Sequence, residues 1–265
     1  MRTPVVLTWL VLGALLFAGC RIGQRRRGTD EVTRLRNAAS AAWVSRSAPG
    51  GLDLARQASL AVLARRPEDA ASLTRLSRIE WIAAHDAPES AVTRFAEGRE
   101  YAWRCLQTDP SFGAALSADS GRLTRANLES VEGASGVCLG LMATHTIGLM
   151  DELGPGSWVE LTELKLVSVR LDALAAASGA AAGSVAQAAW VAGRIAGLGP
   201  DPDRDAEAKK LDEAWQRAPD VLLYPWSLGE AVPERQHELA AAAAAPREIE
   251  DRVFYDRIVA WAAAD

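Results

Sequence analysis

The sequence lacks the short patterns that mark common catalytic and cofactor chemistry. It has only three cysteines and three histidines in 265 residues, and it contains no CxxC, HExxH, P-loop, GxSxG or GxGxxG pattern. Redox and zinc sites, metalloproteases, nucleotide-binding loops and serine hydrolases are recognised by these patterns. We therefore predict a protein that is not an enzyme, with no catalytic residue, no metal and no cofactor.

An excess of positive charge is also absent. The chain carries 29 lysines and arginines against 34 aspartates and glutamates, a formal net charge of −5. Proteins that bind nucleic acid usually present a basic surface, so nucleic acid is not an expected partner. The hydrophobic fraction of 49% is enough, over this length, to bury a sizeable core.

Strand-forming runs are scarce as well, because Val, Ile and Thr rarely alternate with polar residues. Alanine and leucine instead fill segments separated by Pro, Gly, Asp and Ser, a composition typical of helices. In the last of these segments, Val253, Phe254, Ile258 and Trp261 should face inward, so that the segment caps the core. We predict an all-α fold with helices at about residues 30–45, 52–65, 70–84, 89–107, 123–153, 158–176, 184–198, 205–217, 221–229, 233–244 and 247–263.

The amino terminus combines Arg2 with an apolar run from Val5 to Ala18, which is too short for the roughly 20 residues that span a bilayer. It predicts a signal peptide over residues 1–19. Ala18 and Gly19 before Cys20 resemble the bacterial lipoprotein signal, in which the cysteine carries the lipid. An ordinary secretory signal with a coincidental cysteine is the alternative.

The anchoring hypothesis extends to the residues after Cys20. Residues 20–29 contain four arginines with Gly23 and Gly28 between them, a composition suited to a lipidated basic tether, and residues 30–265 form the predicted helical-repeat domain. Arg21 stands where the inner-membrane retention signal has aspartate. We therefore expect the chain in the periplasm, lipid-anchored to the inner leaflet of the outer membrane.

Three segments share a shape in which a helix runs into a proline and then restarts. They are LARQASLAVLARRPEDAASLTRL, EYAWRCLQTDPSFGAAL and KKLDEAWQRAPDVLLYPWSLG, with Pro67, Pro110 and Pro219 at the breaks. The prolines are farther apart than the 34-residue period of tetratricopeptide repeats. We predict a tetratricopeptide-like α-solenoid with degenerate repeats, whose stacked helical hairpins share one core and expose a concave face.

These features together resemble the T component of tripartite ATP-independent periplasmic (TRAP) transporters, a tetratricopeptide-like lipoprotein. The resemblance rests on Ala18-Gly19-Cys20, the paired helices LARRPEDAASLTRLSRIEWIAA and AEGREYAWRCLQTDPSFGAAL, a long central helix near residues 129–149, and DAEAKKLDEAWQRAPDVLLY. It implies transport-associated binding to a TRAP-type periplasmic solute-binding protein, with a small organic or apolar ligand. A homo-oligomer in the form of a small ring of subunits is compatible with it. The alternative function is a scaffold lipoprotein for protein–protein interaction in envelope assembly.

Aromatic and basic residues gather between positions 81 and 104. Their rings could form an apolar wall, while Arg94 and Arg99 could meet a carboxylate. Core tryptophans with solvated arginines are the simpler interpretation of the same pattern. The predicted binding residues are Trp81, Arg94, Phe95, Tyr101 and Trp103, with Arg99 and Arg104 in the same region.

The segment VEGASGVCLGLMATHTIG carries two further patterns. Gly133, Gly136 and Gly140 fall at helical spacing, which predicts a face for close helix packing or for space left to a ligand. Cys138, Met142 and His145 also share a face, where they could serve as copper ligands, although core packing is the favoured interpretation. His85 and His237 lie in separate segments without visible ligand partners.

For Cys105 and Cys138 we favour free, buried thiols. A disulfide between them stays open, because their spacing in the sequence alone cannot decide whether they come within bonding range.

Overall fold

A computed structural model describes residues 30–154, 160–177, 179–243 and 249–262. Within these ranges every regular element is helical, which confirms the predicted all-α fold. The predicted signal peptide at residues 1–19 and the tether at residues 20–29 lie outside the described residues. A helical segment at residues 30–44 is followed by the elements α2 (Gly51–Leu63), α3 (Ala70–Asp86), η1 (Pro88–Ser90), α4 (Ala91–Gln107), α5 (Pro110–Ala118), α6 (Arg125–Glu129), η2 (Gly133–Ser135), α7 (Gly136–Leu153), α8 (Glu160–Ala175), α9 (Ala182–Gly197), α10 (Arg204–Arg217), α11 (Leu223–Ala231), η4 (Pro233–Arg235), α12 (Gln236–Ala242) and α13 (Ile249–Ala262).

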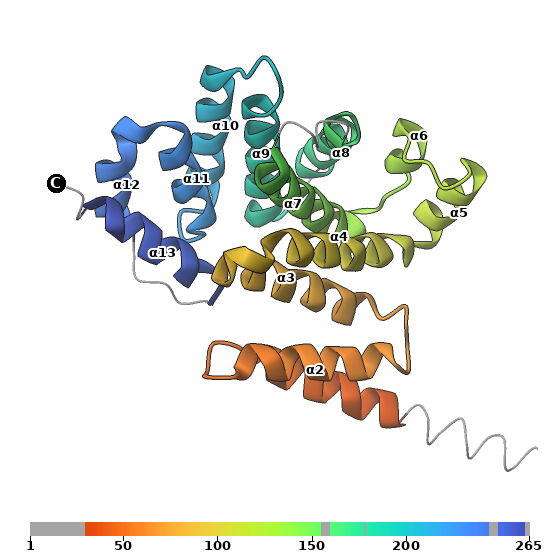
Figure 1. The fold of residues 1–265 in the computed structure, drawn as a ribbon. Coiled ribbons are helices and arrows are strands. Elements are labelled where there is room, and N and C mark those ends of the chain that lie inside the picture. The colour runs from red at the N-terminus through yellow and green to blue at the C-terminus, as the bar shows by residue number, and fades with distance from the viewer. Residues whose placement is uncertain (1–29, 155–159, 178, 244–248, 263–265) are drawn as a thin grey trace, which may run out of the picture.

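Neighbouring helices pack as pairs, as a helical-repeat architecture requires. Figure 1 shows residues 30–44, α2, α3 and α4 as layers that run across the view, with α9 and α10 standing upright above them. The three predicted helix–proline–helix units occur as α2 with α3, α4 with α5, and α10 with α11. Asp69 caps α3 by accepting a hydrogen bond from the Ser72 amide at 3.0 Å, and Asp109 caps α5 in the same way.

The helix α7 lies at the centre of the molecule and contacts α3, α4, α8 and α9 (Figure 1). Each residue from Cys138 to Met150 is buried. The stretch Gly133–Leu153 is long and apolar enough to cross a membrane, but its apolar window is 67% buried inside the protein. That burial is typical of a core helix that is covered by its neighbours.

The final helix α13 closes the core, because it contacts α3, α11 and α12. Phe254 and Ile258 are buried, and half-buried Trp261 packs against the core, as the sequence predicted. The side chain of Val253 lies outside the described residues. The Leu222 amide at the start of α11 donates a hydrogen bond to Asp251 Oδ1 at 2.8 Å, which fixes the two helices to each other.

The single helix predicted at residues 123–153 is wrong. The chain instead forms α6, η2 and α7. Thr124 and Asn127 form a capping box that starts α6, and the Glu132 amide donates to Asp109 Oδ2 at 3.2 Å, holding the chain extended before η2. The helix α5, started by Asp109 and Pro110, had no range of its own among the predicted helices, although the predicted restart after Pro110 implied it.

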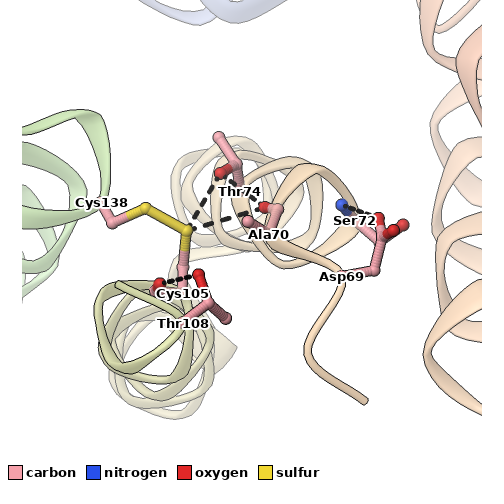
Figure 2. The surroundings of a disulfide bond; sticks show 7 residues. All are labelled: Asp69, Ala70, Ser72, Thr74, Cys105, Thr108 and Cys138. Carbon is pink, nitrogen blue, oxygen red and sulfur yellow. Dashed lines mark hydrogen bonds between the residues drawn. A yellow bond between two sulfur atoms is a disulfide. The ribbon is translucent and has the colours of Figure 1, made fainter. Parts of the chain in front are cut away.

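The favoured interpretation of the cysteines is also wrong, because Cys105 of α4 and Cys138 of α7 form a disulfide with a Cα–Cα distance of 5.7 Å. Figure 2 shows Cys105 beside Thr74 and Ala70 of α3, with the Thr74 hydroxyl oxygen 3.3 Å from Cys105 Sγ. Both cysteines are buried, as expected for apolar helices, but their facing positions on packed helices bring them within bonding range.

Candidate functional site

A cleft of about 710 Å³ lies beside α4, between that helix, α7, α8 and residues 121–123. We call it the α4 cleft. Its volume falls within the roughly 300 to 1,000 Å³ typical of small-molecule sites. Trp103 forms part of its wall and meets the buried Phe112 of α5 edge to face, with ring centroids 5.8 Å apart. The apolar lining consists of Trp103, Leu123, Met142, Leu149, Leu164 and Val167.

The charged residues of the α4 cleft are of both signs. They are Arg99, Glu100, Arg122, Glu160 and Glu163, so the lining carries one net negative charge. Arg99 Nη1 lies 3.0 Å from Glu160 Oε2, an ion pair that joins α4 to α8 across the cleft. Arg122 makes no ion pair with another described residue. The cleft therefore offers an apolar wall with a mixed polar rim and no concentrated positive field.

The structure does not bring the predicted aromatic and basic cluster together in one site. Trp103 and Arg99 line the α4 cleft, whereas Trp81 and Phe95 line a second cavity. Tyr101 is half-buried and packs against the main core. The Arg104 guanidinium donates to the Pro67 carbonyl at 3.1 Å. Trp81 belongs to α3, and the other residues of the cluster belong to α4. The side chains of α4 reach different neighbours because they point in all directions around the helix axis.

Arg94 has a structural partner. The fully buried carboxylate of Glu80 lies 3.0 Å from Arg94 Nη1 and 2.7 Å from Arg56 Nη2, so α2, α3 and α4 share one ion-paired centre. Burial raises the pKa of Glu80 even though both arginines oppose the shift. Burial, followed by the nearby Glu80 charge, raises the pKa of Tyr101. This arrangement joins three helices through one carboxylate and leaves Arg94 little freedom to bind a ligand.

The second cavity, of about 110 Å³, lies among α3, α4, α7, α9, α11 and α13. We call it the aromatic cavity. The rings of Trp81, Phe95, Trp190 and Trp226 line it, and the rings of Trp81 and His85 are 4.4 Å apart. Burial, with the positive charge of Arg257, lowers the pKa of His85 to about 3, so the imidazole is neutral at pH 7.

The glycines of α7 pack against other helices, but not as one face. A Cβ on Gly140 would lie 2.3 Å from Gln187 Oε1 of α9, and one on Gly136 would lie 3.1 Å from Leu174 of α8. Gly133 belongs to η2, outside α7, and faces open space. The helices α4 and α7 also approach closely, since a Cβ on Gly98 would lie 2.0 Å from His145 Cε1 and one on Gly148 would lie 2.7 Å from Phe95.

The copper alternative fails because Cys138 is bound in the disulfide. Its neighbour on the helix face, His145, is fully buried, and its Nε2 lies 3.0 Å from both the carbonyl oxygen and the hydroxyl of Ser77. Burial lowers the pKa of His145 to about 4. His237 is exposed on α12. Among the described residues, no group of three or more His, Cys, Asp or Glu could hold a metal ion.

Comparison with known proteins yields no match, either to a family model or to a curated protein. The candidate site therefore rests on the geometry of this chain. Sequence reasoning missed Arg122 and Glu160 of the α4 cleft, because they approach α4 only through folding. It also missed the proximity of His85 to Trp81, although their spacing of four residues on a predicted helix was a usable signal.

Proposed function

We propose that the chain is a periplasmic, lipid-anchored binding protein that works with a TRAP-type transporter. It engages the transporter's solute-binding protein and takes a small organic ligand into the α4 cleft. The helical-repeat fold and the resemblance given by the Cys20 signal and the paired helices support the transporter association. The observation that carries the binding role is the α4 cleft itself, which has the size of a ligand site.

The lining of the α4 cleft favours a ligand with an apolar body. Trp103, Met142 and Leu164 provide surface that a hydrocarbon or ring can cover. Arg99 is already paired with Glu160, so an anion would have to compete for it. We therefore propose an apolar molecule with a small polar end over a strongly acidic one.

The partner is tested by affinity capture. The full chain is used to capture proteins from solubilised cell envelopes, and the captured proteins are identified. Recovery of a TRAP-type solute-binding protein, together with saturable binding of that purified protein, supports the proposal. Recovery of other envelope proteins, with no affinity for a solute-binding protein, would favour the scaffold alternative.

The ligand site is tested with Trp103→Ala. Removing this ring takes away part of the cleft wall, so we expect binding of a small uncharged aromatic probe such as N-phenyl-1-naphthylamine to fall at least about tenfold. Trp215→Ala is the matched control, since Trp215 is a half-buried tryptophan of α10 that stacks on Arg235 outside the cleft. Equal loss in both variants, or in neither, would remove the α4 cleft from the proposal.

A further inference from the structure

The aromatic cavity contains polar nitrogen atoms that the protein itself does not satisfy. His85 Nε2 is buried and has no hydrogen-bond partner. The Arg257 guanidinium stacks over the Trp226 ring, 5.4 Å from its centroid, and makes no ion pair with another described residue. Buried polar groups are normally hydrogen-bonded, so the His85 nitrogen calls for a partner that the chain does not supply. The half-buried Arg257 brings a positive charge to the same cavity.

The remaining charges around the cavity already have partners or face solvent. Arg194 is held by Asp151 at 2.7 Å and by the buried Glu207 at 3.4 Å. Glu152 is exposed at the rim. Arg257 is thus the lining cation that remains for an incoming anion. The Trp190 indole nitrogen donates to Ser227 Oγ at 2.9 Å, so it adds no further unsatisfied donor.

The walls and the volume restrict the size of that anion. Tryptophan and phenylalanine rings surround the space, which favours an apolar body beneath the charged end. An engineered cavity of about 150 Å³ holds benzene, so 110 Å³ suits a chain of about three to five carbons.

We propose that the aromatic cavity binds a short-chain monocarboxylate. Its carboxylate accepts hydrogen bonds from the Arg257 guanidinium and from His85 in the Nε2–H tautomer, while its hydrocarbon chain lies against Trp81, Trp190 and Trp226. Arginine pairs well with carboxylates because the guanidinium offers two parallel donors. This site is separate from the α4 cleft, and the inference does not depend on the proposed function.

The test titrates the full chain with butanoate by isothermal calorimetry at pH 7. We expect a dissociation constant of roughly 0.1 to 5 mM, as the small number of ligand atoms allows. Butanamide, which has the same shape without the charge, should bind at least about tenfold more weakly. Absence of butanoate binding at roughly 20 mM would show that water alone fills the cavity, and equal affinity for the amide would show that the carboxylate charge is not recognised. Either result would overturn the inference.

Variants locate the site. Arg257→Gln should weaken butanoate binding at least about tenfold, whereas Arg252→Gln, an exposed position on the same helix, should leave it unchanged. Arg99→Gln in the α4 cleft should also have no effect. Butanoate binding that is lost with Arg99 and kept without Arg257 would overturn the assignment. Should Arg257→Gln not fold, the indole NMR signals of the unchanged chain decide, because butanoate must shift those of Trp81, Trp190 and Trp226 and leave that of Trp103 in place.

Discussion

At the scale of single residues, buried ionisable side chains have the clearest measurable effects. His145 has a pKa of about 4 in the folded chain, against 6.5 for a solvated histidine. The unfolded chain therefore binds more protons between these two values, and folding stability falls as the pH drops from about 6.5 to about 4. His85 acts in the same direction, whereas the raised pKa of Glu80 acts in the opposite one.

We predict that His145→Asn flattens this pH dependence. Between pH 7 and pH 4, the free energy of unfolding of the variant should fall by about 3 kcal/mol less than that of the parent chain. Urea unfolding of both chains across this pH range measures the difference. The contributions of His85 and Glu80 are the same in the two chains and therefore drop out of it. His237→Asn, at an exposed histidine, is the control and should keep the parental slope. Parallel curves for His145→Asn and the parent would contradict the prediction.

Arg94 gives a second prediction at this scale. Arg94→Ala leaves the buried Glu80 with Arg56 as its remaining partner, so the free energy of unfolding should fall by roughly 1 to 3 kcal/mol. Arg99→Ala breaks a partly exposed ion pair with Glu160 and should cost less than about 1 kcal/mol. Chemical denaturation compares the two. An equal cost would show that the burial of Glu80 does not add to the cost of losing Arg94. The predicted binding role of Arg94 would then regain support.

At the scale of elements, the contact between α4 and α7 organises the molecule. Gly98 and Gly148 let the two helices approach closely, and the Cys105–Cys138 bridge links them covalently. The same two helices carry Trp103 and Met142 of the α4 cleft. A change in their separation would therefore alter stability and the cleft together.

We predict that Gly98→Ala is destabilising by roughly 1 to 3 kcal/mol, because its Cβ would overlap the ring of the buried His145. Gly133→Ala is the matched control. It lies in η2 with open space around it, so its effect should stay within about 0.5 kcal/mol. Thermal unfolding of the two variants measures the contrast, and similar values would show that the α4–α7 contact adapts to the added methyl group.

Removing the disulfide should have a larger effect. The bridge joins positions separated by 33 residues, and the double variant Cys105→Ser with Cys138→Ser should lose about 3 to 4 kcal/mol of stability. That corresponds to a fall of roughly 10 °C in Tm. Reductant added to the parent chain should reproduce the fall and should not change the double variant. Thiols that react with maleimide in an unreduced, denatured chain carrying Cys20→Ala would show that the bridge does not form.

At the scale of the whole molecule, sequence reasoning succeeded for features that neighbouring residues in the chain determine, such as where helices begin and end. Helix periodicity and the breaks at Pro67, Pro110 and Pro219 located most helices within a few residues. It failed where distant segments meet. The extended stretch at Glu132 depends on a hydrogen bond to Asp109, and the disulfide depends on how α4 faces α7. The aromatic cavity draws Arg257 from the last helix to His85 of α3, a meeting that no local pattern encodes.

The predicted membrane anchor at Cys20 can be tested by mutation. Cys20→Ala should abolish lipid attachment, so we expect the protein to leave the membrane fraction and remain in the soluble periplasmic fraction. Cell fractionation with immunodetection measures this. A control that leaves the disulfide intact is Gly133→Ala, which has open space around the added methyl group. Unchanged processing and membrane association of Cys20→Ala would show that the cysteine is not the anchor.

The bridge between α4 and α7 also determines how the chain responds to a protease. It encloses α5, α6 and the exposed turn at Ser120 and Gly121, whose positive φ angles of 57° and 75° mark a tight reversal. Exposed loop tips of this kind are preferred sites of nicking. A single trypsin cut after Arg122 would therefore leave two fragments joined through sulfur, which migrate together on a non-reducing gel and separate only after reduction.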